Sequence, residues 1–119
     1  RTPVRALNNL GLAYLCKKNY GEAEAAFNKA LRVFPQFALA HNNLGRIYFE
    51  NGKYRDAAQS FQRAIKNDPS YVEPYYYLGT SLTALKYRKE ALDVFKACVR
   101  KGPTDYYGLK CKEHLNILK

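Results

Sequence analysis

The chain has 119 residues, of which 47% are hydrophobic and 25% charged, and its formal net charge is +10 at pH 7. This composition excludes a disordered chain, and the length suits one domain with its own hydrophobic core. No apolar run approaches the ~20 residues that a bilayer span requires, so we expect no membrane span. The Lys and Arg residues are scattered as singles and short doublets, which indicates a solvated basic surface rather than a nucleic-acid-binding stripe.

Seven helical segments follow one another along the chain. Thr2 and Pro3 are suited to the N-cap and first turn of the first helix. Asn51-Gly52 supplies the left-handed residue that a helix C-terminus favours. Pro35, Pro69 and Pro103 each follow a second helix, which proline cannot continue. We therefore predict an all-α fold with helices at residues 3–16, 20–33, 37–50, 54–67, 71–84, 88–101 and 106–118.

The segments belong to a repeat with a period of 34 residues. A Leu-Gly pair recurs in every first helix, and its glycines are Gly11, Gly45 and Gly79. Because glycine inside a helix costs about 1 kcal/mol relative to alanine, its recurrence predicts that another helix approaches closely there. The second helices carry Ala and Phe four residues apart, as in Ala57 and Phe61, and we expect the Phe to fill the space between paired helices.

The last segment begins like a fourth copy, but Lys112-Glu113 stands where Leu-Gly would be. Leu115 and Leu118 form an apolar edge on this helix, and the polar residues are Lys110, Lys112 and Lys119. Terminal units of repeat proteins need a polar outer face, so we predict a capping helix. The N-terminal face has no obvious cap, which leaves it open to further repeats or to self-association.

The three cysteines are Cys16, Cys98 and Cys111, an odd number without CxxC spacing. This pattern argues against a disulfide framework and against a zinc site, and we expect no metal or other cofactor. Cys98 occupies a small-residue position between helices, so we expect it to be a small buried hydrophobe. A Cys98–Cys111 bridge remains the alternative.

The period and its residues resemble the tetratricopeptide repeat, whose pattern is apolar-x2-Leu-Gly-x2-Tyr, then Ala-x3-Phe, Ala and Pro. The second copy supplies Leu44, Gly45, Tyr48, Ala57, Phe61, Ala64 and Pro69. The third copy departs by Leu82 for Tyr and by Cys98 for Ala. The resemblance implies a single domain over 1–119, with repeats 4–37, 38–71 and 72–105 and a capping helix at 106–118. It also implies a right-handed superhelix whose first helices line a concave groove, acting as a platform without catalytic activity.

Positions that differ between the copies are the candidates for function. In the family, the groove positions lie on the first helix of each pair, away from the Leu-Gly-Tyr stripe. In this chain they are Arg5, Asn8, Asn9, Leu12 and Leu15; Leu39, Asn42, Asn43, Arg46, Phe49 and Glu50; Glu73, Tyr76, Tyr77, Thr80 and Thr83; and Tyr107, Lys110 and His114 on the last helix. We expect Tyr75 to pack inside, since successive helical residues point about 100° apart.

These groove residues suit protein recognition. Asn amides can donate to and accept from an extended backbone, Arg can hold a carboxylate, and Tyr and Arg are enriched at interface hot spots. We therefore predict a scaffold or adaptor that binds an extended peptide or a helix of a partner protein, such as an assembly factor of a multiprotein complex. Family members that hold acidic chaperone tails use a carboxylate clamp of Lys and Asn, then Asn, then Lys and Arg. The matching residues here are Asn8, Leu12, Asn43, Glu73 and Tyr77. Only Asn43 fits, so we do not expect such a tail as the partner.

Two other functions are alternatives to protein binding. The stretch "TPVRALNNLGLAYL" and a closing helix after "GPTD" faintly resemble repeat lipoproteins that help assemble bacterial type IV pili or secretion machinery. That alternative leaves both a cytoplasmic and a bacterial periplasmic or outer-membrane-attached location open. A basic nucleic-acid-binding module is the second alternative. We do not expect an enzyme, because His41 and His114 lie in different units and no Gly-rich phosphate loop or HExxH motif is present.

Overall fold

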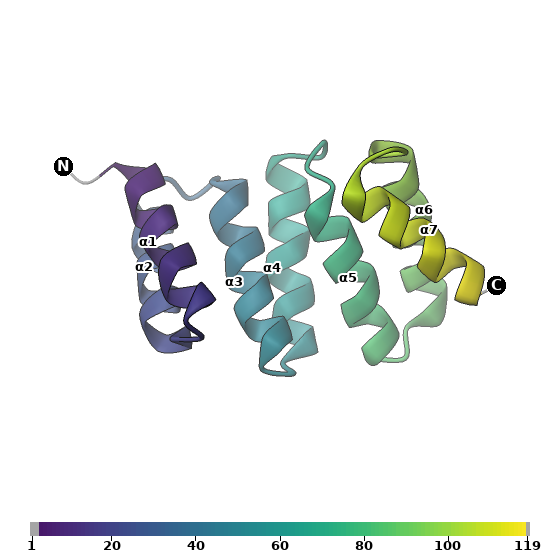
Figure 1. Cartoon of the computed structure of the whole chain (residues 1–119), viewed down its shortest axis with the longest axis horizontal. Coiled ribbons are helices and arrows are strands. Elements are labelled where there is room, and N and C mark those ends of the chain that lie inside the picture. The colour runs from purple at the N-terminus through teal and green to yellow at the C-terminus, as the bar shows by residue number, and fades with distance from the viewer. Residues whose placement is uncertain (1–2, 119) are drawn as a thin grey trace.

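The computed structural model describes residues 3–118, and over that range it consists of seven α-helices and their connecting turns (Figure 1). The helices are α1 (Val4–Cys16), α2 (Tyr20–Val33), α3 (Ala38–Glu50), α4 (Tyr54–Asn67), α5 (Glu73–Ala84), α6 (Arg88–Lys101) and α7 (Tyr106–Leu118). The predicted all-α fold is confirmed, and the predicted helix bounds agree to within two residues. No helix in the described range is long and apolar enough to cross a bilayer.

The helices pack as antiparallel pairs that stack along one axis. α1 packs on α2, α3 on α4 and α5 on α6, and each second helix also contacts the first helix that follows it. Figure 1 shows α1, α3, α5 and α7 in front of α2, α4 and α6, with the two termini at opposite ends. Neighbouring members of the front layer also contact one another, so these four helices form one continuous surface, which we call the A-helix face. The molecule is elongated, with extents of 48 × 25 × 21 Å.

The repeated glycines hold the pairs together. Phe27, Phe61 and Phe95 are fully buried, and each ring lies on the glycine of its own repeat. A Cβ atom at Gly45 would lie 2.5 Å from the nearest carbon of the Phe61 ring, and the other two repeats show the same distance. The prediction of close approach at these glycines is therefore confirmed, and the group that approaches is the phenylalanine ring.

The turn that joins the helices of a pair uses one left-handed residue in each repeat. Gly52 has φ of 75°, as its sequence predicted. The equivalent residues Lys18 and Lys86 adopt the same conformation, with φ of 60° and 71°, although they carry side chains. At the start of the chain, α1 begins at Val4 with Pro3 as N-cap, so the prediction of Pro3 within the first turn is wrong by one residue. Thr2 lies outside the described residues.

The two ends of the stack differ from its middle. Leu10 is 47% exposed, whereas the equivalent Leu44 and Leu78 are 6% and 4% exposed, because a preceding second helix covers only the latter two. On α7, Leu109 and Ile117 are 48% and 78% exposed, so the predicted polar outer face is wrong at these two positions. Leu109 is the equivalent of the buried Tyr75, but no second helix pairs with α7 within residues 3–118. The predicted polar residue Lys119 is not described.

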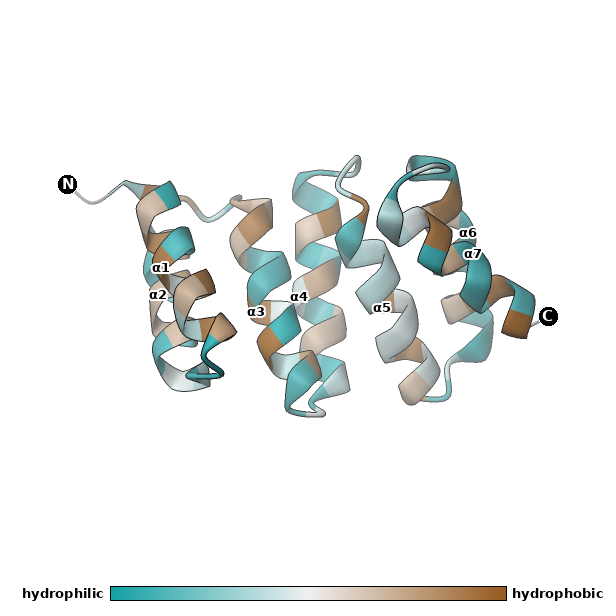
Figure 2. Cartoon of the chain, in the orientation of Figure 1, coloured by the Kyte–Doolittle hydropathy of each residue, from teal (hydrophilic) through white to brown (hydrophobic). Residues whose placement is uncertain are grey.

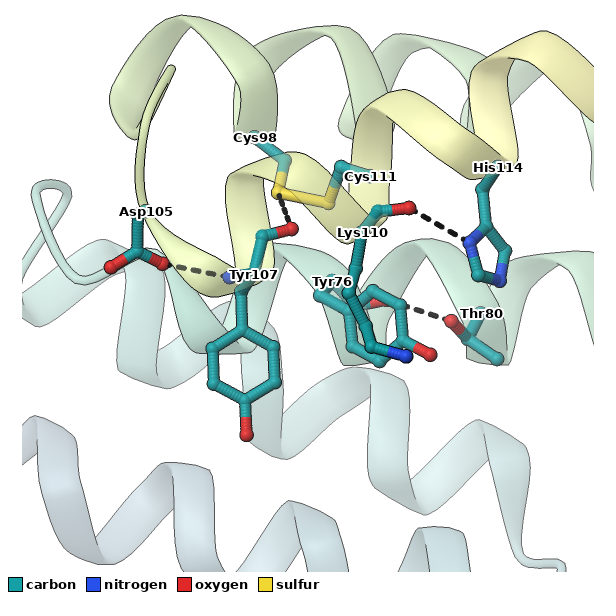
Figure 3. Close-up of a disulfide and its surroundings, with 8 residues drawn as sticks. All are labelled: Tyr76, Thr80, Cys98, Asp105, Tyr107, Lys110, Cys111 and His114. Carbon is teal, nitrogen blue, oxygen red and sulfur yellow. Dashed lines mark hydrogen bonds between the residues drawn. A yellow bond between two sulfur atoms is a disulfide. The ribbon is translucent and has the colours of Figure 1, made fainter.

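A disulfide joins the last two helices. Cys98 of α6 and Cys111 of α7 are both fully buried and are bonded through their sulfur atoms (Figure 3). Cys98 is thus buried as expected, but the expectation of an unbridged residue is wrong. The reason lies in the packing of α7: a Cβ atom at Gly108 would lie 1.6 Å from the carbonyl oxygen of Gly102, so glycine is needed where α7 turns back onto α6. Cys16 is a free, exposed cysteine.

Candidate functional site

The predicted groove residues lie along the A-helix face, but they differ in accessibility. Three are buried, namely Asn8, Asn42 and Asn43. The exposed ones are Arg5, Asn9 and Glu50, and the half-buried ones are Leu12, Leu15, Leu39, Arg46, Phe49, Glu73, Tyr76, Tyr77, Thr80, Thr83, Tyr107, Lys110 and His114. Only the exposed and half-buried residues can contact a partner without rearrangement.

Asn8 and Asn43 form a link between the first two repeats. The side-chain amide of Asn43 donates a 3.0 Å hydrogen bond to the Oδ1 of Asn8, and both residues are 4% exposed. A buried amide requires such a partner because leaving it unpaired costs free energy. Both amides therefore connect α1 to α3 and leave little of their surface accessible, and their role in binding a partner stays a prediction.

Asn42 is also buried. It is 0% exposed, and its Nδ2 donates to Glu73 Oε2 at 2.9 Å and to the Tyr71 hydroxyl at 3.1 Å. Its Oδ1 has no hydrogen-bond partner among the described residues. Tyr76 occupies the same position in the next repeat and is half-buried, because its longer side chain reaches the surface that the Asn42 amide does not. Asn42 is therefore not accessible in this structure, and its role in direct partner contact stays a prediction.

Arg46 lies beside both a carboxylate and an aromatic ring. Its guanidinium Nη1 is 3.8 Å from Glu73 Oε2, and its Cζ lies 5.9 Å from the centroid of the Tyr77 ring. The Arg46 side chain is 35% exposed, so this ion pair contributes little stability but does orient the guanidinium. Asn42 and Arg46 thus both lie beside the same carboxylate oxygen, Oε2 of Glu73.

Aromatic side chains from three helices meet next to this ion pair. We call Phe49, Tyr76, Tyr77, Tyr107 and His114 the aromatic strip. The centroid of the Tyr77 ring lies 5.3 Å from that of Phe49, 5.1 Å from that of Tyr76 and 5.8 Å from that of Tyr107. The centroid of the Tyr76 ring lies 5.6 Å from that of Tyr107 and 5.3 Å from that of His114. The strip thus runs without interruption from the end of α3 across α5 to α7.

The surroundings of the strip can be followed in the figures. Figure 3 shows Tyr107 of α7 and Tyr76 of α5 below the disulfide, with Lys110 and His114 of α7 beside them. In Figure 2, α5 is pale along much of its length, which reflects the intermediate hydropathy of its tyrosines and threonines. Tyr75, by contrast, is 7% exposed, and its hydroxyl donates to the Pro69 carbonyl, so the predicted inward position of Tyr75 is confirmed.

Two tyrosines beside the Glu73 carboxylate, Tyr71 and Tyr107, have raised pKa values. Burial raises the pKa of Tyr107, and the charge of Glu73 and the neighbouring Tyr77 raise it further. Burial likewise raises the pKa of Tyr71, and the Glu73 carboxylate adds to the effect. Both shifts disfavour the phenolate form. The Tyr71 and Tyr107 hydroxyls therefore keep their protons more strongly than exposed tyrosines do.

Of two further features, the sequence offered the first only as the less favoured alternative and gave no sign of the second. The first is the disulfide, which fixes the helix that carries Tyr107, Lys110 and His114. The second is an apolar depression of about 340 Å³ between α4, α5 and α6, lined among others by Ile65, Leu78 and Val94. No cluster of three or more His, Cys, Asp or Glu side chains that could hold a metal ion occurs within residues 3–118.

Similar proteins were found at the level of families and of folds. Models of the tetratricopeptide repeat match residues 4–70 and 42–106. No curated protein sequence matches the chain. Among solved structures, the first TPR domain of Spaghetti (RPAP3) bound to the HSP90 peptide SRMEEVD has a TM-score of 0.88 at 21% identity, over 97% of this chain and 89% of that one.

Two further structures are similar to the same degree. The TPR domain of Arabidopsis OM64 has a TM-score of 0.86 at 20% identity, over 96% of this chain and 94% of that one. The TPR2B domain of yeast Sti1 in complex with pHsp70 has a TM-score of 0.85 at 22% identity, over 97% of this chain and 91% of that one. At these identities the structures show a shared fold. Because the family models match more than half of its sequence, the chain belongs to the tetratricopeptide repeat family.

Proposed function

We propose that this protein is a non-catalytic scaffold that binds a segment of a partner protein on its A-helix face. The observation that carries the proposal is the aromatic strip, because half-buried tyrosines beside Arg46 and Lys110 have the composition of an interface hot spot. The similar domains of RPAP3 and Sti1 support the proposal, since the first holds an HSP90 peptide and the second is in complex with pHsp70.

The partner is proposed to differ from an acidic chaperone tail. Two of the positions at which the clamp would require a cation are occupied by Glu73 and Tyr77. The Glu73 carboxylate would repel an incoming carboxylate, and the nearby Arg46 is already paired with Glu73. Leu12 replaces an amide at a third clamp position. These substitutions support a partner segment that does not depend on a terminal carboxylate.

The proposal is tested by selecting peptides that bind the folded protein from a random library. The affinity of the selected peptides is then measured for the protein and for its variants. We expect Arg46→Ala and Tyr76→Ala each to weaken binding by about tenfold or more, the effect of removing a hot-spot side chain. Tyr87→Ala is the matched control, because Tyr87 is 38% exposed and lies in the turn before α6, outside the A-helix face. Selected peptides that bind both A-helix variants as tightly as the parent would show that the face is not the binding site.

A role in assembling bacterial envelope machinery is the second candidate, and the disulfide is the observation that favours it. Disulfides persist in oxidising compartments such as the periplasm and are rare in the cytosol. In cells that produce the protein naturally, acid quenching followed by alkylation of free thiols in denaturant, which exposes the buried Cys98 and Cys111, should find these two cysteines protected and Cys16 modified by mass spectrometry. Alkylation of all three cysteines would contradict this location, while the peptide-binding proposal would be unaffected.

A further inference from the structure

We propose that the apolar depression between α4, α5 and α6 binds an acidic amphipathic helix of a partner protein, which inserts one large apolar side chain into it. The depression lies on the side of the molecule formed by the second helices, behind the A-helix face in Figure 1. It is therefore a second binding surface, and the inference does not rest on the proposed function. Two independent observations carry it: the lining of the depression, and the cations that stand in register along the second helices.

The depression is an apolar hollow whose base is α5. Both α4 and α6 pack on α5, and the hollow lies between these two second helices. Its base includes Leu78, which is buried, and the ring of Tyr75, whose hydroxyl already donates to the Pro69 carbonyl. The volume of about 340 Å³ is at the lower end of the range for ligand pockets, about 300–1,000 Å³. This size suits one large side chain of a partner rather than a larger molecule.

The hollow depends on a residue in which the third copy differs from the other two. Ala97 lines it, and the equivalent residues of α2 and α4 are Lys29 and Arg63, which are exposed. The stems of Lys and Arg side chains commonly cover apolar surface. The third copy places a methyl group at this position, and it also has Val94 where the second copy has Ser60. The apolar surface is thus a feature of this copy and not of the repeat pattern.

Cations stand in register along the same side of the molecule. The last five residues of each second helix contain two Lys or Arg side chains and no acid. They are Lys29 and Arg32 in α2, Arg63 and Lys66 in α4, and Arg100 and Lys101 in α6, all exposed and none in an ion pair within residues 3–118. Each helix dipole favours cations at its own C-terminus, but the cations of neighbouring helices repel one another. An acidic partner relieves this repulsion, and Lys66 brings its charge to the rim of the hollow.

Two acids determine how the partner lies. Asp93 lines the hollow from α6, nearer to the start of that helix than the cations are. Asp68 follows α4, and its Oδ1 accepts hydrogen bonds from the backbone N–H and the hydroxyl of Ser70. The acidic residues of the partner therefore lie toward Lys66 and Arg100, with an uncharged or basic residue opposite Asp93.

The surface around the hollow favours a helical partner. It is formed by three helices, so it presents side chains and no strand edge with which an extended backbone could pair. A helix satisfies its own backbone hydrogen bonds and docks through side chains alone. One face of such a helix supplies both the apolar anchor and the acidic residues, as in other helices that bind in apolar grooves.

The experiment titrates a synthetic helix into the uniformly ¹⁵N-labelled protein and follows the amide spectrum of the protein. The probe is about 16 residues long, is capped at both ends, and consists of Glu and Ala with one Trp at its centre. Two matched peptides replace the Trp by Ala or every Glu by Lys. We expect saturable shifts from the probe, concentrated in the second half of α4, around Leu78 and in α6. Each matched peptide should bind about tenfold more weakly or less.

Variants of the protein separate the anchor from the charge. Ala97→Arg restores the residue type of the other copies and fills the hollow, so it should weaken binding about tenfold although it adds a positive charge. Lys66→Glu leaves the hollow open and should weaken binding about fivefold, an effect that added salt diminishes. Lys17→Glu makes the same change of net charge in the exposed turn after α1, and its affinity should stay within about twofold of the parent. Thermal unfolding of every variant checks that the fold is intact.

Several results would overturn the inference. One is a spectrum that about 1 mM probe leaves unchanged, and another is unaltered binding by both Ala97→Arg and Lys66→Glu. A short single-stranded RNA that binds this side as tightly as the probe, and equally well after Ala97→Arg, would assign the cations to nucleic acid instead. Tyr76→Ala should bind the probe like the parent. Shifts that fall on the A-helix face and vanish in Tyr76→Ala would overturn this inference and leave the proposed function standing.

Discussion

The ring of Phe61 lies directly on the Cα atom of Gly45, close enough that a Cβ atom there would meet the ring at 2.5 Å. The same pair recurs as Gly11 with Phe27 and as Gly79 with Phe95, at the same distance. Since the three rings are fully buried, none of them can move aside without disturbing the pair of helices that it joins. The relationship makes glycine a packing residue here, in spite of its poor helix propensity.

Gly45→Ala should therefore destabilise the protein. Overpacking typically costs about 1–3 kcal/mol, which we expect to exceed the gain of about 1 kcal/mol in helix propensity. Chemical denaturation of the variant measures the free energy of unfolding. Gly21→Ala is the matched control, because no atom lies within 4 Å of the added Cβ and the change should be neutral or stabilising. A Gly45→Ala protein as stable as its parent would contradict the packing argument.

The Asn8–Asn43 hydrogen bond should behave as a coupled pair. Asn43→Ala leaves the buried Oδ1 of Asn8 without its donor and should lower the free energy of unfolding by about 1–3 kcal/mol. Adding Asn8→Ala removes the orphaned group, so the double variant should lose clearly less than the sum of the two single changes. Asn9→Ala, at the exposed neighbouring position, should have little effect. Strictly additive losses in this double-mutant cycle would rule out the coupling.

Reduction of the disulfide should destabilise the C-terminal end of the stack. Cys98 and Cys111 are 13 residues apart, and closing a loop of about that size contributes roughly 3 kcal/mol in the chain-entropy view. Unfolding with and without reducing agent measures the difference. The Cys98→Ala/Cys111→Ala variant should no longer respond to the reducing agent, whereas Cys16→Ala should respond like the parent. A parent protein whose stability is indifferent to reduction would speak against the bond.

The left-handed turn residues offer a stabilising change. Lys86 has φ of 71°, and this left-handed conformation costs a residue with a side chain about 1–2 kcal/mol. Glycine avoids that cost, but its greater freedom in the unfolded chain lowers stability by up to about 1 kcal/mol. Lys86→Gly should thus raise the free energy of unfolding by roughly 1 kcal/mol. Gly52→Lys, at the equivalent turn, is the reciprocal control and should lower it by a similar amount. Thermal denaturation measures both variants, and stabilities that change in the same direction would be inconsistent with this account.

Alkaline pH should weaken the fold through Tyr71 and Tyr107. Their pKa values in the folded state are raised above the ordinary value of about 10, mainly by burial. As pH rises above about 10, the unfolded chain releases these protons while the folded chain keeps them, so the unfolded state binds fewer protons and stability falls. Below that pH the two groups contribute no pH dependence. Tyr71→Phe and Tyr107→Phe should each flatten the fall in a series of urea unfolding curves, and unchanged slopes would refute the assignment.

The sequence alone determined the architecture, because the features that specify it are local and repeated. Helical periodicity, a proline after each pair and a glycine against a phenylalanine lie within one period of 34 residues, and each copy confirms the others. The helix bounds and the packing role of Gly45 could be predicted for that reason. The inward position of Tyr75 also followed from helix geometry, since its neighbours Tyr76 and Tyr77 point elsewhere.

The tertiary structure decided which of the predicted groove residues remain accessible. Asn42 and Tyr76 occupy equivalent positions in successive repeats. Asn42 is buried and donates hydrogen bonds to Tyr71 and Glu73, whereas Tyr76 is half-buried in the aromatic strip. The Cys98–Cys111 bond likewise depends on the angle at which α7 folds back onto α6. Burial and pairing of this kind depend on distances between different repeats. Those distances are set by the packing of side chains on neighbouring helices, and the repeat pattern within one helix does not specify that packing.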